Sequence, residues 1–296
     1  MSGGPCLSVV IPTRDRRRLL EQTLAALDRQ RELPCPFEVV VVDDGSTDGT
    51  GEWLQLAQFG GFTLQQIATR PGGPARARNL AIRRAAAPRV LLLGDDTVPA
   101  KDLLAAHLAA AAGRDVAVQG RIDWDPARPV TEVMRFLAPA GPQFWFEGLG
   151  DGGPVPFSAV LASNLSAPTR WFREEPFDER FTEACLEDTE LAWRWQQRGW
   201  PAVYSATAVC WHRHHYDRIE PFLDRQRRAG RWARLAAAIH PALRWRVALQ
   251  PIAFAAVSAL RVALRWRRRD LWDLRCRLAF AKGYLSRPRP GVDGEG

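Results

Sequence analysis

Two adjacent carboxylates follow a short apolar run in the first third of the chain. In the stretch VLLLGDDTVP, residues 90–99, Asp95 and Asp96 come directly after four apolar residues and a glycine. A buried strand that ends in acids is typical of open α/β sheets, where ligands bind beyond the carboxyl ends of the strands. Two neighbouring carboxylates repel each other unless a cation or solvent relieves them. The stretch therefore predicts either a cation site or a solvated polar turn.

A second acidic loop follows an earlier apolar run. Residues 37–42, FEVVVV, lead directly into Asp43-Asp44 and a loop of glycines and hydroxyl side chains. No GxGxxG or GxxxxGK[ST] motif follows a predicted strand, which excludes the usual dinucleotide and Walker A phosphate loops. Acids at strand ends can instead bind a base, a ribose or a divalent cation, and a cation between a carboxylate and a diphosphate would let such a site hold phosphate.

The elements that position these acids alternate between strand and helix. β-branched apolar runs predict strands over residues 6–12, 37–42, 62–68, 90–93, 116–122 and 202–210. Leucine or alanine spacing predicts helices over residues 14–27, 51–58, 75–87, 103–112 and 183–200. This alternation indicates an α/β fold with a mainly parallel, doubly wound sheet. The proline- and glycine-rich segment 125–156 predicts a long, partly mobile loop.

Composition and charge divide the chain into a globular body and a basic tail. With 296 residues, 46% hydrophobic and 25% charged, it can build one large domain and an appendage. The net charge is +8, but residues 213–296 alone hold 19 Lys/Arg against 7 Asp/Glu. Such a tail predicts contact with an anionic surface. Residues 251–264, interrupted by Arg261, are expected to be too short to span a membrane.

The termini and cysteines indicate the compartment. The five cysteines are scattered and lack CxxC spacing, which predicts a reducing compartment and no disulfide framework. The N-terminal residues lack the pattern of a secretory signal peptide.

With these pieces in order, the chain resembles the family-2 glycosyltransferases over about residues 7–235. The resemblance is carried by collinear motifs: SVVIPTRDR, VVVDDGSTDGT, ARARNLAIRRA, VLLLGDDTVP, FDERF, LEDTELAWRWQQRGW and a strand running into Trp211-His212. It implies a GT-A fold, which is a Rossmann-like, mostly parallel central sheet flanked by helices, here with a basic helical C-terminal extension. Residues 1–215 would form the catalytic domain, with a nucleotide-sugar-binding half over about 1–122 and an acceptor half over 123–215, and residues 216–296 the extension.

The resemblance implies an inverting transfer of a sugar from a nucleotide-diphospho-sugar to a hydroxyl group. Pro12, Thr13 and Arg14 would line the base and ribose site, although the family usually has Tyr-Asn where this chain has Arg14-Asp15. Asp44, or Asp43 as the alternative, would hydrogen-bond the base.

The resemblance also implies contacts at the ribose and the diphosphate. Asp95 would lie beside the ribose. Arg76 and Arg78 would reach the diphosphate, or else be surface arginines of a helix.

The stretch 90–99 aligns with the family's DxD motif, but Gly94 stands where the first Asp is usual. Asp96 is then the expected ligand of Mg²⁺ or Mn²⁺, which neutralises charge on the leaving diphosphate. His212 matches the histidine that completes the metal site in many relatives, the alternative being a surface histidine. Inverting transfer needs one general base, expected to be Asp188, with Glu187 next. Both acids would also suit the positive end of a helix dipole.

The tail interleaves arginine with apolar and aromatic residues, which predicts helices lying on an anionic membrane surface. A solvated pair of basic helices is the alternative; nucleic-acid binding is not expected, because no recognition module is visible. A lipid-linked or glycan acceptor would explain such a tail. We therefore expect a UDP-, GDP- or dTDP-sugar donor, a role in cell-surface polysaccharide or glycolipid synthesis, and a cytoplasmic location on the inner face of the cytoplasmic membrane.

Two other functions compete with this interpretation. A nucleotidyltransferase-like protein would need a lysine- and glycine-rich phosphate loop, which Ile11-Pro12-Thr13-Arg14 is not. A non-catalytic, degenerate nucleotide-sugar-binding protein acting through its basic tail would explain the loss of the first DxD carboxylate at Gly94.

Overall fold

The computed structural model describes residues 3–286. The strands of this part are β1 (Leu7–Thr13), β2 (Phe37–Asp43), β3 (Thr63–Ala68), β4 (Arg89–Leu93), β5 (Thr97–Pro99), β6 (Ala117–Trp124), β7 (Asn164–Pro168) and β8 (Ala202–His212). The helices are α1 (Arg17–Leu27), α2 (Thr50–Leu56), α3 (Pro74–Arg84), α4 (Leu103–Ala111), α5 (Glu132–Leu137), α6 (Thr169–Glu174), α7 (Glu187–Gln197), α8 (Glu220–Ile239), α9 (Gln250–Arg265) and α10 (Arg268–Leu285).

The described residues group into two compact units. One takes the chain up to Val130 together with Leu137–His215, and the other takes Thr131–Phe136 and the chain from Tyr216 onward. The first unit holds the sheet and the acidic loops, so it contains the candidate site.

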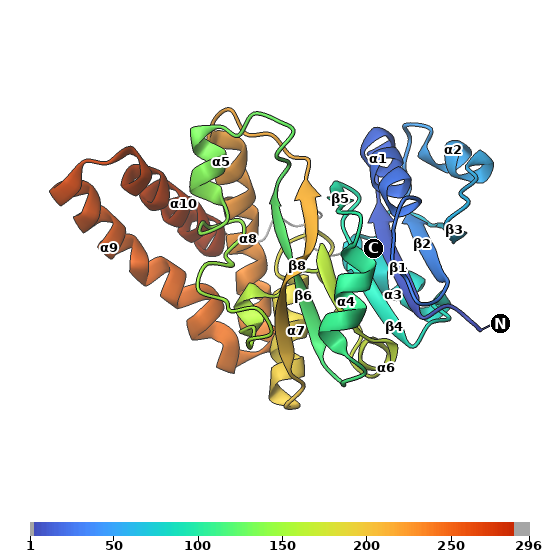
Figure 1. The fold of residues 1–296 in the computed structure, drawn as a ribbon. Coiled ribbons are helices and arrows are strands. Elements are labelled where there is room, and N and C mark those ends of the chain that lie inside the picture. The colour runs from blue at the N-terminus through green and yellow to red at the C-terminus, as the bar shows by residue number, and fades with distance from the viewer. Residues whose placement is uncertain (1–2, 287–296) are drawn as a thin grey trace. The chain divides into compact units, whose positions relative to one another are not determined.

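The first unit is built on one mixed sheet with the strand order β3-β2-β1-β4-β7-β6-β8-β5 (Figure 1). β3, β2, β1 and β4 run parallel, as expected for a doubly wound sheet, while β7 is antiparallel to both β4 and β6. Every residue of β2 and β4 is buried, which explains why apolar residues dominate both strands. α3 packs against β1 and β2, and α4 packs against β6 and β8. The expected mostly parallel sheet flanked by helices is confirmed.

Strand register brings the functional segments to the same end of the sheet. Thr13 at the end of β1 pairs with Asp43 at the end of β2, and Val10 pairs with Leu92 of β4. β5 pairs with the last strand so that Thr97 lies opposite His212. Both acidic loops and His212 therefore meet where the parallel strands end, which is the usual ligand side of such a sheet.

The segment 125–156 is not the single mobile loop that its prolines and glycines predicted. It contains the short helix α5 and an isolated bridge between Ala140 and Trp145. Phe144 and Phe146 are buried within the first unit. Burial of these aromatic rings offsets the entropy of ordering the segment, which composition alone does not reveal.

The cysteine spacing predicts no disulfide framework, but Cys6 and Cys35 are joined in one disulfide, with a Cα–Cα distance of 6.0 Å. Cys6 directly precedes β1, Cys35 lies just before β2, and the parallel register of Leu7 with Phe37 places the two cysteines side by side. Cys185, Cys210 and Cys276 are free and buried. A disulfide removes the argument from cysteine spacing for a reducing compartment.

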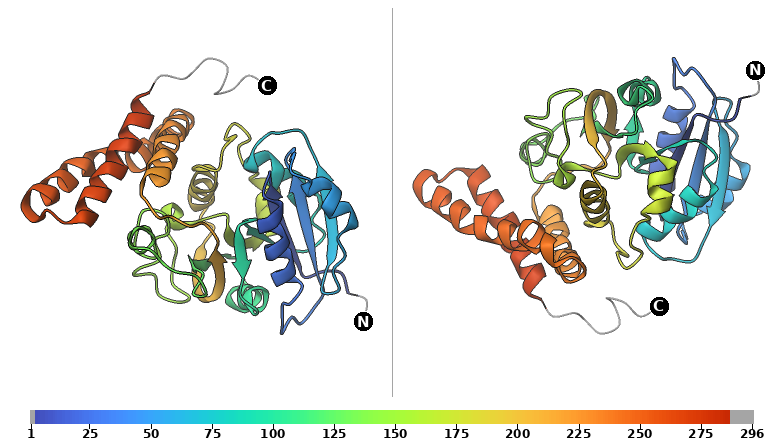
Figure 2. Two further views of the ribbon diagram at one scale, coloured as in Figure 1. Left: turned by 90° about the horizontal axis from the view of Figure 1, so that it is seen from above. Right: turned by 90° about the horizontal axis from the view of Figure 1, so that it is seen from below.

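The second unit is mainly helical, and Figure 2 shows its helices from two further sides. α10 packs against both α8 and α9. A Cβ at Gly230 of α8 would collide with the backbone of Phe280, and one at Gly283 of α10 would collide with the backbone of Arg227, so these glycines allow the two helices to touch. The helical run Trp245–Arg265 is longer than the predicted 251–264 segment: its 21 residues are long and apolar enough to cross a membrane, judged by length and composition only. The expectation that this segment is too short is therefore wrong.

Candidate active site and metal centre

Asp95 and Asp96 are both buried at the end of β4, and a single arginine bridges them. Arg16 Nη1 lies 3.0 Å from Asp95 Oδ1 and 3.0 Å from Asp96 Oδ2, and Thr13 Oγ1 donates to Asp95 Oδ2 at 2.9 Å. Burial and the adjacent Asp96 raise the pKa of Asp95 to about 6. For Asp96, burial is outweighed by His212, His214 and Arg16, so its pKa is held well below the usual range. Arg16 is thus a member of the candidate site that the sequence analysis did not single out.

The loop that carries the two acids is held closed by hydroxyl groups. Thr97 Oγ1 donates to the Gly94 carbonyl at 2.8 Å, and Thr23 Oγ1 donates to the Asp95 carbonyl at 3.0 Å. A Cβ at Gly94 would lie 3.0 Å from Asp96 Oδ1. Because Gly94 has no side chain, the carboxylate of Asp96 can lie against this turn.

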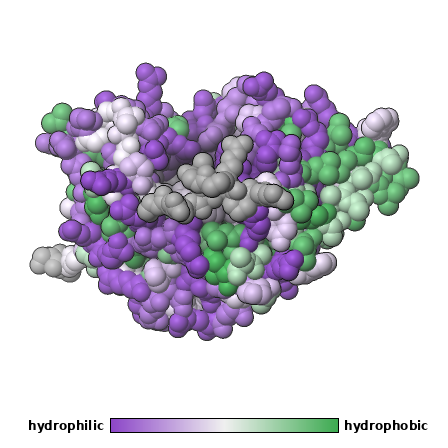
Figure 3. All heavy atoms as spheres, turned by 180° about the vertical axis from the view of Figure 1, so that it is seen from behind, coloured by the Kyte–Doolittle hydropathy of each residue, from purple (hydrophilic) through white to green (hydrophobic). Residues whose placement is uncertain are grey.

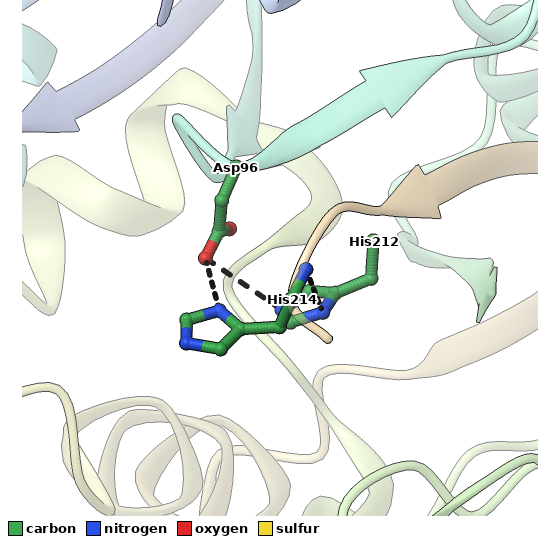
Figure 4. A group of neighbouring side chains, drawn as sticks. All are labelled: Asp96, His212 and His214. Carbon is green, nitrogen blue, oxygen red and sulfur yellow. Dashed lines mark hydrogen bonds and ion pairs between the residues drawn. The ribbon is translucent and has the colours of Figure 1, made fainter. Parts of the chain in front are cut away.

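Asp96 forms one cluster with two histidines (Figure 4). His214 Nδ1 lies 3.3 Å from Asp96 Oδ2, and His212 Nε2 lies 3.7 Å from the same oxygen. The ligand atoms of the three residues all lie within 4.8 Å of one another. The backbone explains how the chain brings them together, because Thr97 pairs with His212 and the Arg213 N–H donates to the Asp96 carbonyl at 2.9 Å. The structure thus places the predicted pair Asp96 and His212 together, and His212 is buried rather than a surface histidine.

His214 is the member of this cluster that had no predicted role. The signal for it is the spacing His212-Arg213-His214, since alternate residues of an extended segment point to the same side. One carboxylate and two imidazoles form a donor set that fits a divalent transition-metal ion better than Mg²⁺, which prefers oxygen ligands. The His214 N–H donates to His212 Nδ1 at 3.3 Å, a bond that would open if His212 Nε2 bound a metal.

Two aromatic rings pack against His212 of this cluster. The ring of Phe144 lies edge-on to His212 at 5.1 Å between centroids, and that of Trp124 lies edge-on at 5.7 Å. Both rings are buried and come from segments distant in sequence. Packing of this kind restricts the rotamer of a metal-binding histidine.

The acids of the second loop hold neighbouring loops in place. Asp44 accepts hydrogen bonds from the N–H groups of Gly72 and Gly73, at 2.9 and 2.8 Å, and burial raises the pKa of its carboxyl. Asp43 Oδ1 accepts from the Ser46 N–H at 2.8 Å. The Asp44 N–H donates to the Thr13 carbonyl at 2.9 Å, so this loop lies beside the end of β1. The carboxylate oxygens of both acids keep further lone pairs for a base.

The two arginines of α3 differ in their surroundings. Arg78 and Glu187 form a buried ion pair, with Nη1 2.7 Å from Oε1, so Arg78 is not a surface arginine. Burial and the adjacent Asp188 raise the pKa of Glu187. Arg76 is half-buried and donates to the Arg70 carbonyl at 3.2 Å.

Asp188 is less buried than Glu187 and is linked through the backbone to the loop that follows β4. Its Oδ2 accepts from the Ala162 N–H at 3.1 Å, while the next residue, Ser163, accepts at its carbonyl from the Gly94 N–H at 3.3 Å. Pro12 and Arg14 lie at the end of β1, where Pro12 is half-buried and Arg14 exposed. Of the predicted pair, Glu187 is therefore neutralised by an arginine, whereas the carboxylate of Asp188 accepts from the N–H groups of Ala162 and Thr189.

The sequence matches a known protein family and is similar to characterised proteins. A family model described as Glycosyl transferase family 2 matches residues 8–181. Validoxylamine A glucosyltransferase of Streptomyces hygroscopicus subsp. limoneus is 33% identical over 227 residues, which cover 68% of this chain and 50% of the relative. The chain thus spans about half the length of this relative.

Two solved structures share the fold. The mannosyltransferase PcManGT from Pyrobaculum calidifontis, in complex with GDP-Man and Mn²⁺, matches with a TM-score of 0.63 and 21% identity over 96% of this chain and 88% of its own. S. aureus TarS 1–349 in complex with UDP-GlcNAc matches with a TM-score of 0.51 and 20% identity over 95% of this chain and 93% of its own.

Proposed function

The chain belongs to glycosyl transferase family 2, and from this premise we propose that it is a glycosyltransferase that transfers a sugar, with inversion, from a nucleotide-diphospho-sugar to a hydroxyl group. The observation that carries the proposal is the convergence of Asp96, His212 and His214 at the strand ends, with Asp188 linked to the same loop. This arrangement supports a proposal in which Asp96 and the two histidines assist departure of the diphosphate and Asp188 activates the acceptor.

In the proposed reaction, Asp188 accepts the proton of the acceptor hydroxyl. The hydroxyl oxygen then bonds to the anomeric carbon, while the bond from that carbon to the diphosphate breaks and its electron pair leaves with the diphosphate. Asp96, His212 and His214 would hold a divalent cation, which when bound neutralises charge on the leaving diphosphate. Mn²⁺ suits this donor set better than Mg²⁺.

The donor is proposed to lie across the ends of β1, β2 and β4. Thr13, which already bonds Asp95, would contact the ribose with that carboxylate, and Pro12 and Arg14 would line the base. The carboxylate of Asp44, or that of Asp43, would accept a hydrogen bond from the base. Arg76 is the better placed of the two α3 arginines to reach the diphosphate, because Arg78 is held by Glu187.

A donor screen tests this proposal. We expect one of UDP-, GDP- or dTDP-sugars, with Mn²⁺ present, to raise the melting temperature by several degrees, since a ligand that binds only the folded state stabilises it. The same donor should be hydrolysed slowly in the absence of acceptor, and EDTA should remove both effects. If no nucleotide-sugar shifts the melting temperature and none is hydrolysed or transferred, the chain would instead be a degenerate member of the family.

The second unit supports a proposal about location. α9 exposes apolar side chains along its length, among them Phe254, Val257, Leu260 and Leu264, which are 43, 42, 59 and 75% exposed. Only 17% of the apolar stretch within the helical run Trp245–Arg265 is buried. Figure 3 shows hydrophobic residues gathered on this unit. Exposed arginines lie at both ends of this segment, at positions 244, 246, 265, 267, 268 and 269. An exposed apolar helix with basic ends suits the interface of an anionic bilayer.

We therefore propose that the protein binds the inner face of the cytoplasmic membrane, whose anionic lipids attract such arginines, and acts there on a lipid-linked or glycan acceptor in cell-surface polysaccharide or glycolipid synthesis. The α10 side of α9 carries a polar network, in which Ser258 bonds Asp273 and Asp273 pairs with Arg277. That network favours a helix lying in the interface over one crossing the bilayer.

Vesicle binding checks the membrane proposal. The protein should sediment with phosphatidylglycerol vesicles, bind phosphatidylcholine vesicles more weakly, and be released by high salt. The double variant Leu260→Glu/Leu264→Glu should lower the partition coefficient at least about tenfold, because two apolar side chains lose a favourable transfer and two charges are added. Leu56→Glu, at a leucine that is 82% exposed in the first unit, is the matched control and should bind as the unaltered protein does. Equal binding by the double variant would exclude α9 as the contact.

A further inference from the structure

The Asp96 oxygen that faces the two histidines already pairs with the guanidinium of Arg16. Arg16 Nη1 lies 3.0 Å from Asp96 Oδ2, and His214 Nδ1 and His212 Nε2 approach that same oxygen at 3.3 and 3.7 Å. A divalent ion held by these three ligands would therefore lie close to the guanidinium. Two cations that share one carboxylate oxygen repel each other, and beside the buried Asp96 this repulsion is screened less than in bulk water.

We propose that Arg16 is a built-in counter-ion, which neutralises the Asp95–Asp96 pair in the metal-free protein and is displaced from Asp96 when a divalent cation binds; this rests on the proposed metal site. The guanidinium links both acids, so without it two adjacent buried carboxylates would face each other. Metal affinity is accordingly set by an exchange on Asp96, since each metal ion that enters must first break a charge-assisted hydrogen bond.

The surroundings of Arg16 allow this movement. Its side chain is 42% exposed, whereas that of Asp95 is only 8% exposed. Arg16 also borders an open surface hollow of about 640 Å³ that is lined by the acids Asp15, Asp48 and Glu21 and by the arginines 17 and 18. After displacement the guanidinium would keep Asp95 as a partner and would have room in this hollow. The buried Arg78, by contrast, is enclosed with Glu187 and has no comparable exposure.

Mn²⁺ binding to the nucleotide-free protein tests the proposal without any turnover. Free Mn²⁺ is measured by electron paramagnetic resonance for the unaltered protein, Arg16→Gln and Arg16→Lys. Arg16→Gln should bind Mn²⁺ at least about tenfold more tightly, because a charge-assisted hydrogen bond no longer has to be broken. Arg16→Lys keeps the positive charge and should stay within about threefold of the unaltered protein. Arg17→Gln, one residue along α1 and paired with Glu21, is the matched control and should leave the affinity unchanged.

The outcomes separate this inference from the proposed function. Mn²⁺ binding by the unaltered protein with no gain in Arg16→Gln would overturn the counter-ion role and leave the metal site standing. Binding by Arg16→Gln alone would support the exchange. Absence of Mn²⁺ binding in both would overturn the metal site and the exchange together. If Arg16→Gln does not fold, the side-chain Nε–H resonance of Arg16 in ¹⁵N-labelled unaltered protein, assigned by its loss in Arg16→Lys, should move on titration with diamagnetic Zn²⁺; a resonance that stays in place would contradict displacement.

Discussion

Replacing Asp96 with Asn should lower turnover about a thousandfold and remove Mn²⁺ binding. The amide keeps the size of the side chain but loses the negative charge on the oxygen that faces His212 and His214. A bound cation supplies several kcal/mol of stabilisation to a transition state that gathers charge on the leaving group, and about 4 kcal/mol corresponds to a thousandfold in rate. Transfer rates at saturating donor and Mn²⁺ binding by electron paramagnetic resonance measure the two effects.

The control for this variant is another Asp→Asn change outside the cluster. Asp102 is exposed just before α4 and makes no capping hydrogen bond through its side chain, so Asp102→Asn should leave both readouts unchanged. If Asp96→Asn bound Mn²⁺ as tightly as the unaltered protein, the proposed ligand set would be wrong, whatever the rate.

Asp188→Asn should lower kcat by about a hundred- to ten-thousandfold, which is the usual contribution of a general base. The Michaelis constant for the donor and Mn²⁺ binding should change little, because Asp188 is proposed to meet the acceptor and not the nucleotide. The amide oxygen can keep the hydrogen bond from the Ala162 N–H, but the amide nitrogen cannot accept the one that Oδ1 now takes from the Thr189 N–H at 2.8 Å, so denaturant unfolding of the variant is measured alongside. Initial rates over a range of donor and acceptor concentrations separate these effects, and full turnover by the variant would exclude Asp188 as the base.

Glu187→Gln is the matched comparison, because it removes the neighbouring charge of the same pair. Glu187 neutralises the buried Arg78, and breaking a buried ion pair costs about 3 kcal/mol of unfolding free energy. We therefore expect a loss of stability in denaturant titrations and a smaller loss of kcat than in Asp188→Asn. The reverse pattern, with kcat lost in Glu187→Gln and kept in Asp188→Asn, would make Glu187 the base.

Much of the first unit could be predicted because its signals are local. The apolar runs of β1, β2 and β4 and the acids that end them are contiguous in sequence, and the buried strands confirm them. The order of these motifs was sufficient for the family. The order also indicated Asp96 and His212 as one site, which the pairing of β5 with β8 brings together. By contrast, the length of the helical run at Trp245–Arg265 was underestimated, because a helix can continue through an arginine when the remaining residues favour it.

By itself, then, the sequence determined the alternation of strands and helices, the family and the acids that lie at the strand ends. The tertiary structure decided which side chains contact the same carboxylate oxygen and which aromatic rings pack against His212. It brought His214 and Arg16 to Asp96, ordered Phe144 against His212, and joined Cys6 to Cys35. Hydrophobic periodicity depends only on residues close together in sequence. These contacts depend instead on strand register and on side-chain packing between segments far apart in the chain, which no local pattern encodes.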